Sequence, residues 1–512
     1  MIRRDGVCTS LWQDNIAPYE TSSKADRNLV YDVIIVGGGI TGISTALLLQ
    51  TADKKCLVLE AANLCFGTTG GTTAHLNTLL DTPYTTISKN FGAENARLVA
   101  TAAKEAIDLI RANIITYGID CGFDEADAYL FAQDEKQEKE LEDILQATKE
   151  AGVVAEYSND IPVNIPFSKA IRVKGQAKFN PIPYVYGLAT TFEKAGGTII
   201  QDCRVTDVDD NEIVKVSTTI GEFKTKDLIY ATHIPPGINL LHLRCVPYRS
   251  YAMAVTVIDK QHYPRDLAYD MHDPYHYYRT QVVNGQNYLI IGGKDHKTGH
   301  EENAERQFLE LESHIREHFD IKSIDYKWSS QYYEPADGLP YIGHIPGHPQ
   351  NIFVATGFGG NGMTYSSVAA LTLKEILLNE QNKYADLFNP NRIKPIAGFT
   401  NFIKHNADVV RLFAGKWFSG EDLQQLADLA PGEGRLVKYN KHKIALYKDE
   451  AGALHAVNPA CVHMKCDVHW NSAEKSWDCP CHGARYSFDG KMLNGPASAD
   501  LEQIKIRVLV EK

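Results

Sequence analysis

Residues 31–42 read Tyr-Asp-Val-Ile-Ile-Val-Gly-Gly-Gly-Ile-Thr-Gly, and they decide the fold of the N-terminal part of the chain. An apolar, β-branched run ends in a glycine turn, a helical pattern follows, and a second short strand at 56–59 ends at an acidic residue. In this context the glycines let the backbone approach a pyrophosphate at the helix N-terminus, and the acid accepts hydrogen bonds from ribose hydroxyls. The stretch therefore predicts a Rossmann-type dinucleotide site rather than a glycine-rich turn without a ligand. The predicted site residues are Gly37, Gly39, Gly42 and Glu60.

A second glycine motif, at 357–362 (Gly-Phe-Gly-Gly-Asn-Gly), follows a strand-like run at 351–355 and opens a helix. It could form a separate nicotinamide site. However, no strand with an acidic residue follows before the chain becomes polar near Asn379, and the dinucleotide fingerprint needs both features. We therefore interpret this segment as a helix N-terminus directed at the same cofactor.

Two short segments late in the chain carry metal-ligand chemistry: 461–466 (Cys-Val-His-Met-Lys-Cys) and 479–483 (Cys-Pro-Cys-His-Gly). Two cysteines on one iron and two histidines on the other form the ligand set of a Rieske [2Fe–2S] centre. A zinc site uses the same residue types, but a Cys-x-His pair is too tight for the usual zinc knuckle. The segments therefore predict a protein that handles single electrons.

These segments resemble the Rieske family, whose pattern reads Cys-Thr-His-x-Gly-Cys and Cys-Pro-Cys-His-Gly-Ser. The resemblance implies four cluster ligands, Cys461, His463, Cys479 and His482, and a disulfide between Cys466 and Cys481 as in respiratory-type members. The chain departs from the pattern at three positions, which are Val462, Lys465 and Ala484. Ala484 replaces a serine whose hydroxyl would bond to a cluster sulfur, although Tyr486 could supply one such bond. Because hydrogen bonds to sulfur raise the potential, we expect a potential below that of respiratory centres. A redox titration in which Ala484→Ser gives no rise would contradict this expectation.

A second resemblance covers most of residues 30–380. The segments 337–343 (Asp-Gly-Leu-Pro-Tyr-Ile-Gly) and 351–357 (Asn-Ile-Phe-Val-Ala-Thr-Gly) resemble the late flavin motif of the D-amino-acid oxidase superfamily. In that family the first βαβ unit holds the ADP half of FAD, and the late loop and helix meet the flavin ring or ribityl chain. The resemblance implies further FAD contacts along the chain, namely Thr68, Thr69, Val205, Asp337, Gly357, Gly362, Met363 and Thr364.

The fold expected from these signals is an α/β FAD-binding Rossmann-type domain with an antiparallel α+β substrate domain, followed by an all-β Rieske domain. We place the oxidoreductase at 1–388, a linker and helix at 389–418, and the Rieske domain at 419–512. Within the first part, the FAD-binding segments are about 30–80, 170–235 and 335–380, and the substrate part is about 85–165 and 240–333. Helix signals cover about 93–116, 134–151, 183–194 and 303–319, and strand signals about 251–258, 275–279, 288–292 and 325–332.

The substrate side is less well defined. A carboxylate-bearing substrate needs a bidentate partner, which suits arginine, and Arg279 at the end of an aromatic strand is the candidate. The alternative is an arginine that merely closes a strand, and we assign such a structural role to Arg249. His296 is a candidate base or hydrogen-bonding group at the flavin, although a solvated turn would also explain it. His75 could link the flavin covalently, but its register does not match relatives that do so.

Composition limits the classes of partner and the cellular compartment that we expect. The 512 residues carry a formal net charge of −12, which argues against nucleic acid or an anionic membrane as a partner. We expect no signal peptide, since the Arg3-Arg4 pair has no apolar run behind it, and no membrane span. Six scattered cysteines without a spacing pattern are typical of a reduced, cytoplasmic protein.

Together the resemblances imply an FAD-dependent dehydrogenase fused to its own Rieske electron acceptor. It would oxidise a CH–NH or CH–NH2 group of an amine or amino-acid substrate and pass electrons singly to an external acceptor, a protein or a quinone. One alternative is a reductase that feeds a partner oxygenase, and another is a non-catalytic redox sensor. A Rieske oxygenase would need a 2-His-1-carboxylate iron site, and His272 and His276 have no evident carboxylate partner in the sequence.

Overall fold

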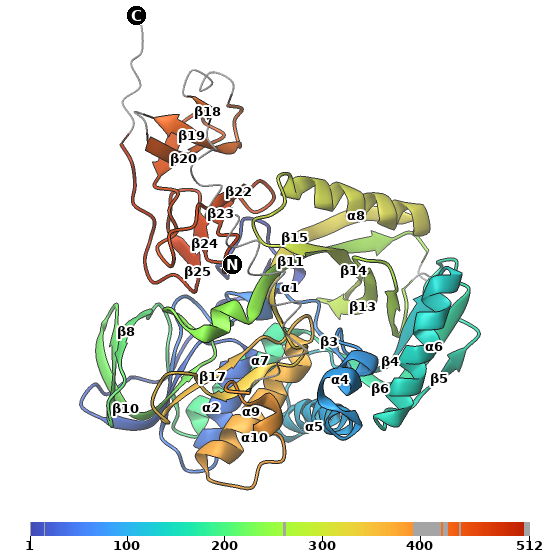
Figure 1. Ribbon diagram of the computed structural model, residues 1–512, viewed down its shortest axis with the longest axis horizontal. Helices are drawn as coiled ribbons and strands as arrows, with labels where there is room; N and C mark the ends of the chain where they lie inside the picture. The colour runs from blue at the N-terminus through green and yellow to red at the C-terminus, as the bar shows by residue number, and fades with distance from the viewer. Residues whose placement is uncertain are drawn as a thin grey trace, which may run out of the picture.

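The computed structural model describes residues 2–14, 16–259, 263–392, 421–422, 429–439 and 442–505. Two large sheets form the front of the chain and two small sheets form its C-terminal part (Figure 1). The linker and helix expected at 389–418 lie almost wholly outside the described residues.

The first large sheet holds the predicted βαβ unit. Its strand β1 (Val30–Val36) pairs in parallel with β2 (Cys56–Leu59) on one side and β10 (Gly221–Tyr230) on the other. The spatial order is β16-β17-β10-β1-β2-β7, with β8 and β9 added beside β10. The other strands are β7 (Thr198–Ile200), β8 (Val205–Asp209), β9 (Val214–Thr218), β16 (Tyr341–His344) and β17 (Ile352–Thr356). Residues 33–36 are all buried, as expected of a parallel strand that is covered on both faces.

Helices pack together beside this sheet (Figure 1). The helix α2 (Ile40–Gln50) contacts α7 (Pro181–Lys194) and α9 (Gly362–Leu377), and α9 also contacts α5 (Ala93–Tyr117). The α5 helix ends at Gly118, whose left-handed conformation (φ 62°) stops it. The helices predicted at 93–116 and 183–194 are thus confirmed. Shorter helices are α1 (Leu11–Asp14), α3 (Thr68–Gly71), α4 (Tyr84–Phe91) and α10 (Ala385–Phe388).

The second large sheet has the order β15-β11-β14-β13-β12-β4-β6-β3, with β5 beside β6. Its strands are β3 (His75–Leu76), β4 (Asp124–Ala132), β5 (Ala155–Ser158), β6 (Lys169–Lys178), β11 (Cys245–Val257), β12 (Leu267–Asp270), β13 (Tyr277–Val283), β14 (Gln286–Lys297) and β15 (Ile321–Pro335). The four predicted strands are confirmed as β11, β13, β14 and β15, whereas β4 and β6 were not predicted individually. The predicted helices α6 (Glu135–Glu150) and α8 (Ala304–His318) contact this sheet.

The C-terminal part contains two four-stranded sheets with the orders β18-β19-β20-β21 and β22-β23-β24-β25. Their strands are β18 (Glu421–Asp422), β19 (Gly434–Tyr439), β20 (His442–Lys448), β21 (Leu454–Val457), β22 (His469–Asn471), β23 (Ser476–Asp478), β24 (Arg485–Ser487) and β25 (Met492–Asn494). A core that includes Trp477 and Tyr486 joins the sheets to both cysteine-containing segments.

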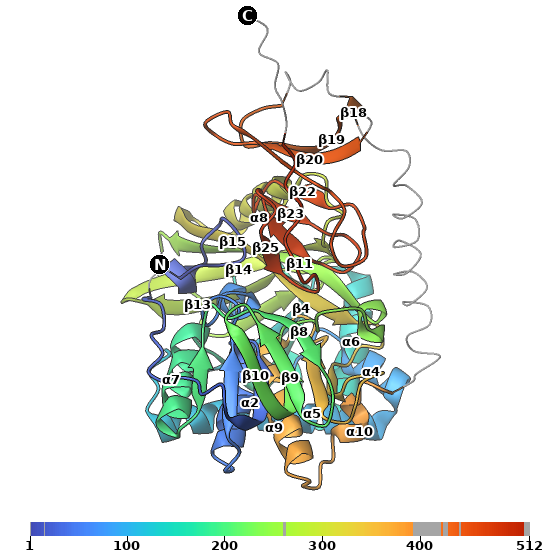
Figure 2. The same cartoon turned by 90° about the vertical axis from the view of Figure 1, so that its left-hand side faces the viewer.

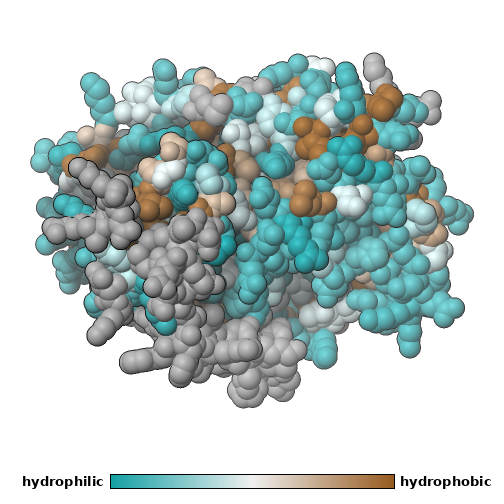
Figure 3. Space-filling view, turned by 90° about the horizontal axis from the view of Figure 1, so that it is seen from above, coloured by the Kyte–Doolittle hydropathy of each residue, from teal (hydrophilic) through white to brown (hydrophobic). Residues whose placement is uncertain are grey.

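The C-terminal part lies against the second large sheet. In two perpendicular views, β22–β25 lie next to β11 and β15, and the N-terminus of the chain lies beside them (Figures 1 and 2). Seen from above, hydrophilic residues cover most of the face that is not grey, and apolar residues form small separate groups (Figure 3). Within the described ranges, no helix has both the length and the apolar character that crossing a membrane requires.

Candidate functional site

A cavity of about 620 Å³ is lined by residues of both large sheets and of the C-terminal part. We call one part of it the nucleotide end, which is lined by residues 36–41, 59–62 and 203–208. We call the other part the tyrosine end, where four tyrosines of the second sheet and its loops meet two aspartates. These residues are Tyr269, Tyr275, Tyr277, Tyr332, Asp81 and Asp295.

The nucleotide end has the features that the dinucleotide fingerprint requires. Gly37 has φ 115°, a conformation that suits glycine, and a Cβ on Gly42 would lie 1.9 Å from the Gly37 carbonyl oxygen. Helix α2 therefore begins directly on the turn. Glu60 follows β2 and accepts hydrogen bonds from the N–H groups of Gly38 (2.7 Å) and Ala62 (2.8 Å). Burial raises the pKa of Glu60, although these hydrogen bonds oppose the rise. The turn, the helix N-terminus and the acid together form a cradle that fits the ADP part of FAD.

Most predicted FAD contacts line this cavity, namely Gly37, Gly39, Glu60, Thr68, Thr69, Val205, Gly362 and Met363. The second glycine motif also lines it, from Phe358 to Met363, so both glycine motifs face one cavity rather than two. Asp81 connects them to the tyrosine end, because its Oδ2 accepts the N–H of Gly360 at 2.8 Å.

Four predicted contacts do not line the cavity: Gly42, Asp337, Gly357 and Thr364. Asp337 forms an ion pair with Arg392, which donates to its two oxygens at 2.8 Å. The Thr364 hydroxyl lies 3.3 Å from the Asn77 carbonyl oxygen, to which it donates. Gly357 has φ 72°, and a Cβ there would lie 3.2 Å from the Cys245 sulfur. These four residues lie behind the lining of the cavity, and their direct contact with FAD stays a prediction.

The structure places Arg279 away from the cavity. Its guanidinium is fully buried and donates to the carbonyl oxygens of Thr73 (2.7 Å), Ala74 (2.6 Å) and Phe179 (3.3 Å). A guanidinium held by these carbonyls is not available for a substrate carboxylate. The predicted ligand role is therefore not supported. The alternative, an arginine that merely closes a strand, is also incomplete, since Arg279 stabilises the loop at 73–74.

His296 also points elsewhere. Its Nε2 lies 3.0 Å from the Tyr251 hydroxyl and its Nδ1 lies 2.9 Å from the Lys297 carbonyl oxygen. The preceding residue, Asp295, lines the cavity instead. Tyr332 donates to Asp295 Oδ2 at 2.8 Å, while Oδ1 is buried without a hydrogen-bond partner. Burial raises the pKa of Asp295 to about 6, although the nearby hydroxyls of Ser250 and Tyr332 oppose the rise. Sequence reasoning placed the run Asp295-His296-Lys297 at the flavin but chose His296 as its functional group instead of Asp295.

The four predicted cluster ligands come together in the C-terminal part. Cys461 and Cys479 are buried free thiols, and a hydrogen bond with Cys479 lowers the pKa of Cys461 to about 6. The Nδ1 atoms of His463 and His482 are buried without a hydrogen-bond partner. Two thiols and two unpartnered imidazole nitrogens are the donor set of a Rieske cluster, so the residues present fit this group.

Other expectations for these segments hold as well. Cys466 and Cys481 form a disulfide that joins the two ligand segments. The Tyr486 hydroxyl lies 3.2 Å from the Cys461 sulfur, so it supplies a hydrogen bond to a ligand sulfur. Ala484 is fully buried and offers no hydroxyl.

The histidine side of the cluster segments faces the oxidoreductase part. His463 Nε2 lies 2.9 Å from the Gly237 carbonyl oxygen, and the rings of His463 and His482 both pack on His242. His482 is 2% exposed.

Strand β15 connects the cluster segments to the cavity. Tyr333 donates its hydroxyl to the His482 carbonyl oxygen at 3.1 Å, and Gln331 Nε2 donates to the Gly483 carbonyl oxygen at 2.9 Å. Both Tyr333 and Gln331 also line the cavity. One layer of side chains therefore separates the cavity from a predicted cluster ligand.

The C-terminal part also closes the nucleotide end. Residues 492–495, 497 and 498, in and after β25, line the cavity there. Arg204 Nη2 lies 3.4 Å from the Met492 carbonyl oxygen across this contact. The contribution of the C-terminal part to this end was not predicted.

A cluster of six buried charges joins the N-terminal segment, the second sheet and the C-terminal part. The three cations are Arg4, Arg249 and Arg485, and the three anions are Asp5, Glu474 and Asp478. Glu474 accepts from the N–H (2.9 Å) and hydroxyl (2.7 Å) of Ser329. Asp5 accepts from Arg485 at 3.0 Å. Burial would raise the pKa of Asp5, but Arg485 and Arg4 outweigh it and lower that pKa. We call these six residues the ionic cluster.

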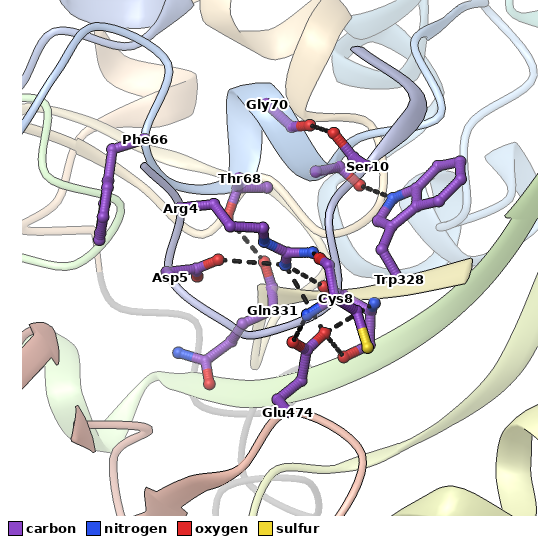
Figure 4. Close-up of polar contacts among 12 residues, drawn as sticks. Arg4, Asp5, Cys8, Ser10, Phe66, Thr68, Gly70, Trp328, Gln331 and Glu474 are labelled. Carbon is purple, nitrogen blue, oxygen red and sulfur yellow. Dashed lines mark hydrogen bonds and ion pairs between the residues drawn. The ribbon is translucent and has the colours of Figure 1, made fainter. Parts of the chain in front are cut away.

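The N-terminal segment 2–14 also supports the threonine-rich loop at 67–73. Arg4 and Glu474 face each other across the segment, and Ser10 reaches Gly70 (Figure 4). The Ser10 hydroxyl donates to the Gly70 carbonyl oxygen at 2.6 Å, and Trp12 Nε1 donates to that of Thr72 at 2.6 Å. Sequence reasoning missed this segment, because its partners are distant in the sequence, from 60 residues for Ser10 and Gly70 to 466 residues for Cys8 and Glu474.

His276 does have a carboxylate partner, which corrects an expectation from the sequence. Its Nδ1 lies 2.7 Å from Asp270 Oδ2, and its ring stacks on His314 with centroids 3.9 Å apart. His272 is not among the residues that approach this group closely enough to share a metal ion.

Comparisons with known proteins agree with this architecture. The profile of the FAD dependent oxidoreductase family (DAO) matches residues 32–376, and that of the Rieske [2Fe-2S] domain matches 421–505. The chain is 34% identical over 93% of its length to the "Putative Rieske 2Fe-2S iron-sulfur protein YhfW" of Bacillus subtilis (strain 168), 93% of which is covered. It is 24% identical to gamma-glutamylputrescine oxidoreductase of Escherichia coli (strain K12), over 72% of this chain and 88% of that protein. Glycine oxidase from Geobacillus kaustophilus has a similar fold, with a TM-score of 0.60 at 17% identity, over 71% of this chain and 99% of that one.

Proposed function

The chain belongs to the family of FAD dependent oxidoreductases and carries a Rieske domain, and we propose that it oxidises an amine or amino-acid-like substrate and passes the electrons through its cluster to an external acceptor. The reacting group would be CH–NH or CH–NH2. The names of similar proteins support this class, since they include a gamma-glutamylputrescine oxidoreductase, a glycine oxidase and L-amino acid deaminases.

The residues for both cofactors are present in one chain. Gly37, Gly39 and Glu60 would hold the ADP part of FAD, and the start of α9 would meet its flavin part. The two cysteines and two histidines of the C-terminal segments would hold the cluster. Bound FAD would supply a two-electron acceptor and the bound cluster a one-electron carrier, the two capacities that such a reaction needs.

The observation that carries the proposal is the contact between cavity and cluster segments. Tyr333 and Gln331 line the cavity and at the same time donate to the carbonyl oxygens of His482 and Gly483. The ionic cluster also joins the C-terminal part to the second sheet near this contact. A chain that only stored two unrelated cofactors would not need its cluster segments to face the cavity wall.

The proposal is tested by anaerobic mixing of the holoprotein with a panel of amines and amino acids. Flavin absorbance and the electron paramagnetic resonance signal of the cluster are followed together. We expect flavin bleaching first and the signal of the reduced cluster second. A Cys479→Ser variant with normal FAD content should still bleach but give no cluster signal. Cluster reduction by NADH alone would contradict the proposal and favour a reductase that feeds a partner oxygenase. Failure of the whole panel would favour a redox sensor.

A cytoplasmic location remains part of the proposal. It is supported by the free cysteines outside the cluster segments, which include buried Cys56, Cys65 and Cys121. Proteins of reducing compartments keep such thiols unpaired.

A further inference from the structure

The tyrosine end of the cavity carries negative charge without a matching cation. Asp81 and Asp295 are its carboxylates, and the charge of Asp81 adds to the rise in the pKa of Asp295. Burial raises the pKa of Asp81 to about 6, against hydrogen bonds from Gly360 and Asn361. Burial and these two aspartates also raise the pKa of Glu334, to about 7. Burial at this end therefore disfavours ionised carboxylates, and a bound cation would offset that cost.

Among the described residues, no arginine or lysine lines the tyrosine end, and His276 faces Asp295 from outside the cavity lining. Arg204 is the one arginine or lysine in the described part of the chain that lines the cavity, and it lies beside Val205 at the nucleotide end. Arg279 is held by backbone carbonyl oxygens under the loop at 73–74. A substrate carboxylate would need a guanidinium or ammonium partner. At the tyrosine end such a group would instead meet two aspartates.

One oxygen at this end is ready to accept a hydrogen bond. Asp295 Oδ1 is buried and unpartnered, while its Oδ2 already accepts from Tyr332. An unpartnered buried acceptor is costly, and an ammonium group would satisfy it as a donor. A neutral alcohol could donate as well, but it would leave the two charges uncompensated.

Aromatic rings complete the enclosure. The rings of Tyr275 and Tyr277 lie 5.8 Å apart between centroids, and His75 packs on Tyr269 (5.4 Å) and on Tyr277 (5.6 Å). Burial keeps the pKa of Tyr269 and Tyr277 far above neutral pH, so both remain uncharged. Ring faces attract ammonium and alkylammonium groups, and several rings around one site form a cage for them.

We propose that the tyrosine end binds a cationic amine that lacks a carboxylate on its nitrogen-bearing carbon, with Asp295 and Asp81 as its counter-charges. This rests on the proposed oxidoreductase function and narrows its substrate from amines or amino acids to amines. The reaction balances as R–CH2–NH3⁺ giving R–CH=NH2⁺, with one proton released and one hydride, which carries two electrons, transferred to bound FAD. The carboxylate of Asp295 is the acceptor for the released proton. Water then converts the iminium to an aldehyde and ammonium.

The test separates binding from oxidation. Three probes share one alkyl chain: n-butylamine, norvaline, which is the same amine with a carboxylate on the reacting carbon, and n-butyltrimethylammonium, which cannot be oxidised in this way. Binding to the anaerobic holoprotein is followed by the change in flavin absorbance at equilibrium and by the rise in melting temperature. We expect both cations to bind in a saturable manner and norvaline to bind at least about tenfold more weakly, a difference of about 1.4 kcal/mol.

Variants connect the binding to the named residues. Asp295→Asn should weaken binding of n-butyltrimethylammonium about tenfold or more. Asp325→Asn serves as the matched control, since Asp325 is exposed on β15 and bonds to Thr256 and Ser323 outside the cavity. If Asp81→Asn and Asp295→Asn both bind the quaternary cation as tightly as the control, the inference is wrong.

The outcomes distinguish this inference from the proposed function. Equal or tighter binding of norvaline, or no saturable response to either cation, overturns the inference. Flavin bleaching by amino acids in that case leaves the proposed function intact. Conversely, cation binding that depends on Asp295, without bleaching by any amine, supports the inference and counts against amine oxidation.

Discussion

The buried carboxylates on the two faces of strand β15 differ in whether they are paired with cations. On one face Ser329 bonds to Glu474, which belongs to the ionic cluster and has Arg4 and Arg249 within 4 Å. On the other face Tyr332 bonds to Asp295, whose second oxygen has no partner. The first arrangement is complete, and the second lacks a cation.

This difference separates architecture from ligand binding. Three cations and three anions balance in the ionic cluster, so its groups hold the N-terminal segment and the C-terminal part in place without a ligand. Among the described residues, no arginine or lysine that lines the cavity balances the aspartates at the tyrosine end. Buried charge is tolerated when it is paired, so an unbalanced site indicates that a ligand supplies the missing charge.

The largest expected effect concerns the ionic cluster and is tested with two adjacent arginines. Arg4 is 5% exposed and approaches Asp5 and Glu474, whereas Arg3 is 61% exposed in its ion pair with Asp202. Arg4→Ala leaves buried anions short of a cation and should cost about 3 kcal/mol of unfolding free energy. Arg3→Ala should change it by less than about 1 kcal/mol. Chemical denaturation of the holoprotein, followed by cluster absorbance, measures both. Equal effects would mean that Arg4 is an ordinary surface residue.

The contribution of Asp478 to stability should depend on pH in the direction that is usual for a carboxylate in an ion pair. Burial would raise the pKa of Asp478, but Arg485 and Arg249 lower it below its ordinary value. Its stabilising contribution is therefore present above the unfolded pKa of about 3.9 and is lost as pH falls through the folded value. Asp478→Asn should cost about 2 kcal/mol near neutral pH, because a hydrogen-bonded charge is lost. The cost should shrink in acid, which melting temperatures across pH would show. A cost independent of pH would contradict the ion-pair explanation.

The matched substitution on the other face, Asp295→Asn, should change the free energy of unfolding in the opposite direction. The pKa of Asp295 is raised to about 6, and the groups that face it are Asp81, His276, Ser250 and Tyr332. A raised carboxyl pKa costs stability as pH rises from the unfolded value to the folded one. Asp295→Asn should therefore stabilise the ligand-free holoprotein by about 1 kcal/mol at neutral pH, a value reduced for water in the cavity. The gain should disappear below about pH 4. Destabilisation at neutral pH would place Asp295 with the structural charges.

Local motifs allowed both cofactor sites to be predicted from the sequence. The glycine turn with Glu60 and the two cysteine-histidine segments each concentrate their chemistry within a few consecutive residues, and the resemblance adds the late flavin segment. The tyrosine end depends instead on the register of separate strands. Side chains alternate across a strand, so Asp295 enters the cavity while the adjacent His296 turns to Tyr251. No local signal distinguishes these two orientations.

Two errors have a longer-range cause. Arg279 lies on the same strand as Tyr277, yet the loop at 73–74 covers it and occupies its donors. The N-terminal segment likewise binds partners across the whole chain, as when the Cys8 N–H donates to Glu474 at 3.2 Å. Such contacts are set by tertiary packing, so neither could be inferred from neighbouring residues.

The smallest expected effect concerns the boundary between the two faces, where Tyr333 donates to the His482 carbonyl oxygen at 3.1 Å. Tyr333→Phe removes this hydrogen bond and the one that the hydroxyl accepts from Gln331 Nε2 at 3.1 Å, and it keeps the ring. Because Gln331 keeps its bond to Gly483, the change should cost about 1 kcal/mol of unfolding free energy. If this contact holds the cluster segments against the cavity wall, its loss should slow cluster reduction after flavin bleaching while leaving bleaching unchanged. Tyr248→Phe is the control, because Tyr248 stacks on Tyr332 in the same region and does not line the cavity. Rapid mixing with an active amine measures both rates. Equal slowing in the two variants would show a general loss of packing rather than a specific role for the Tyr333 hydroxyl.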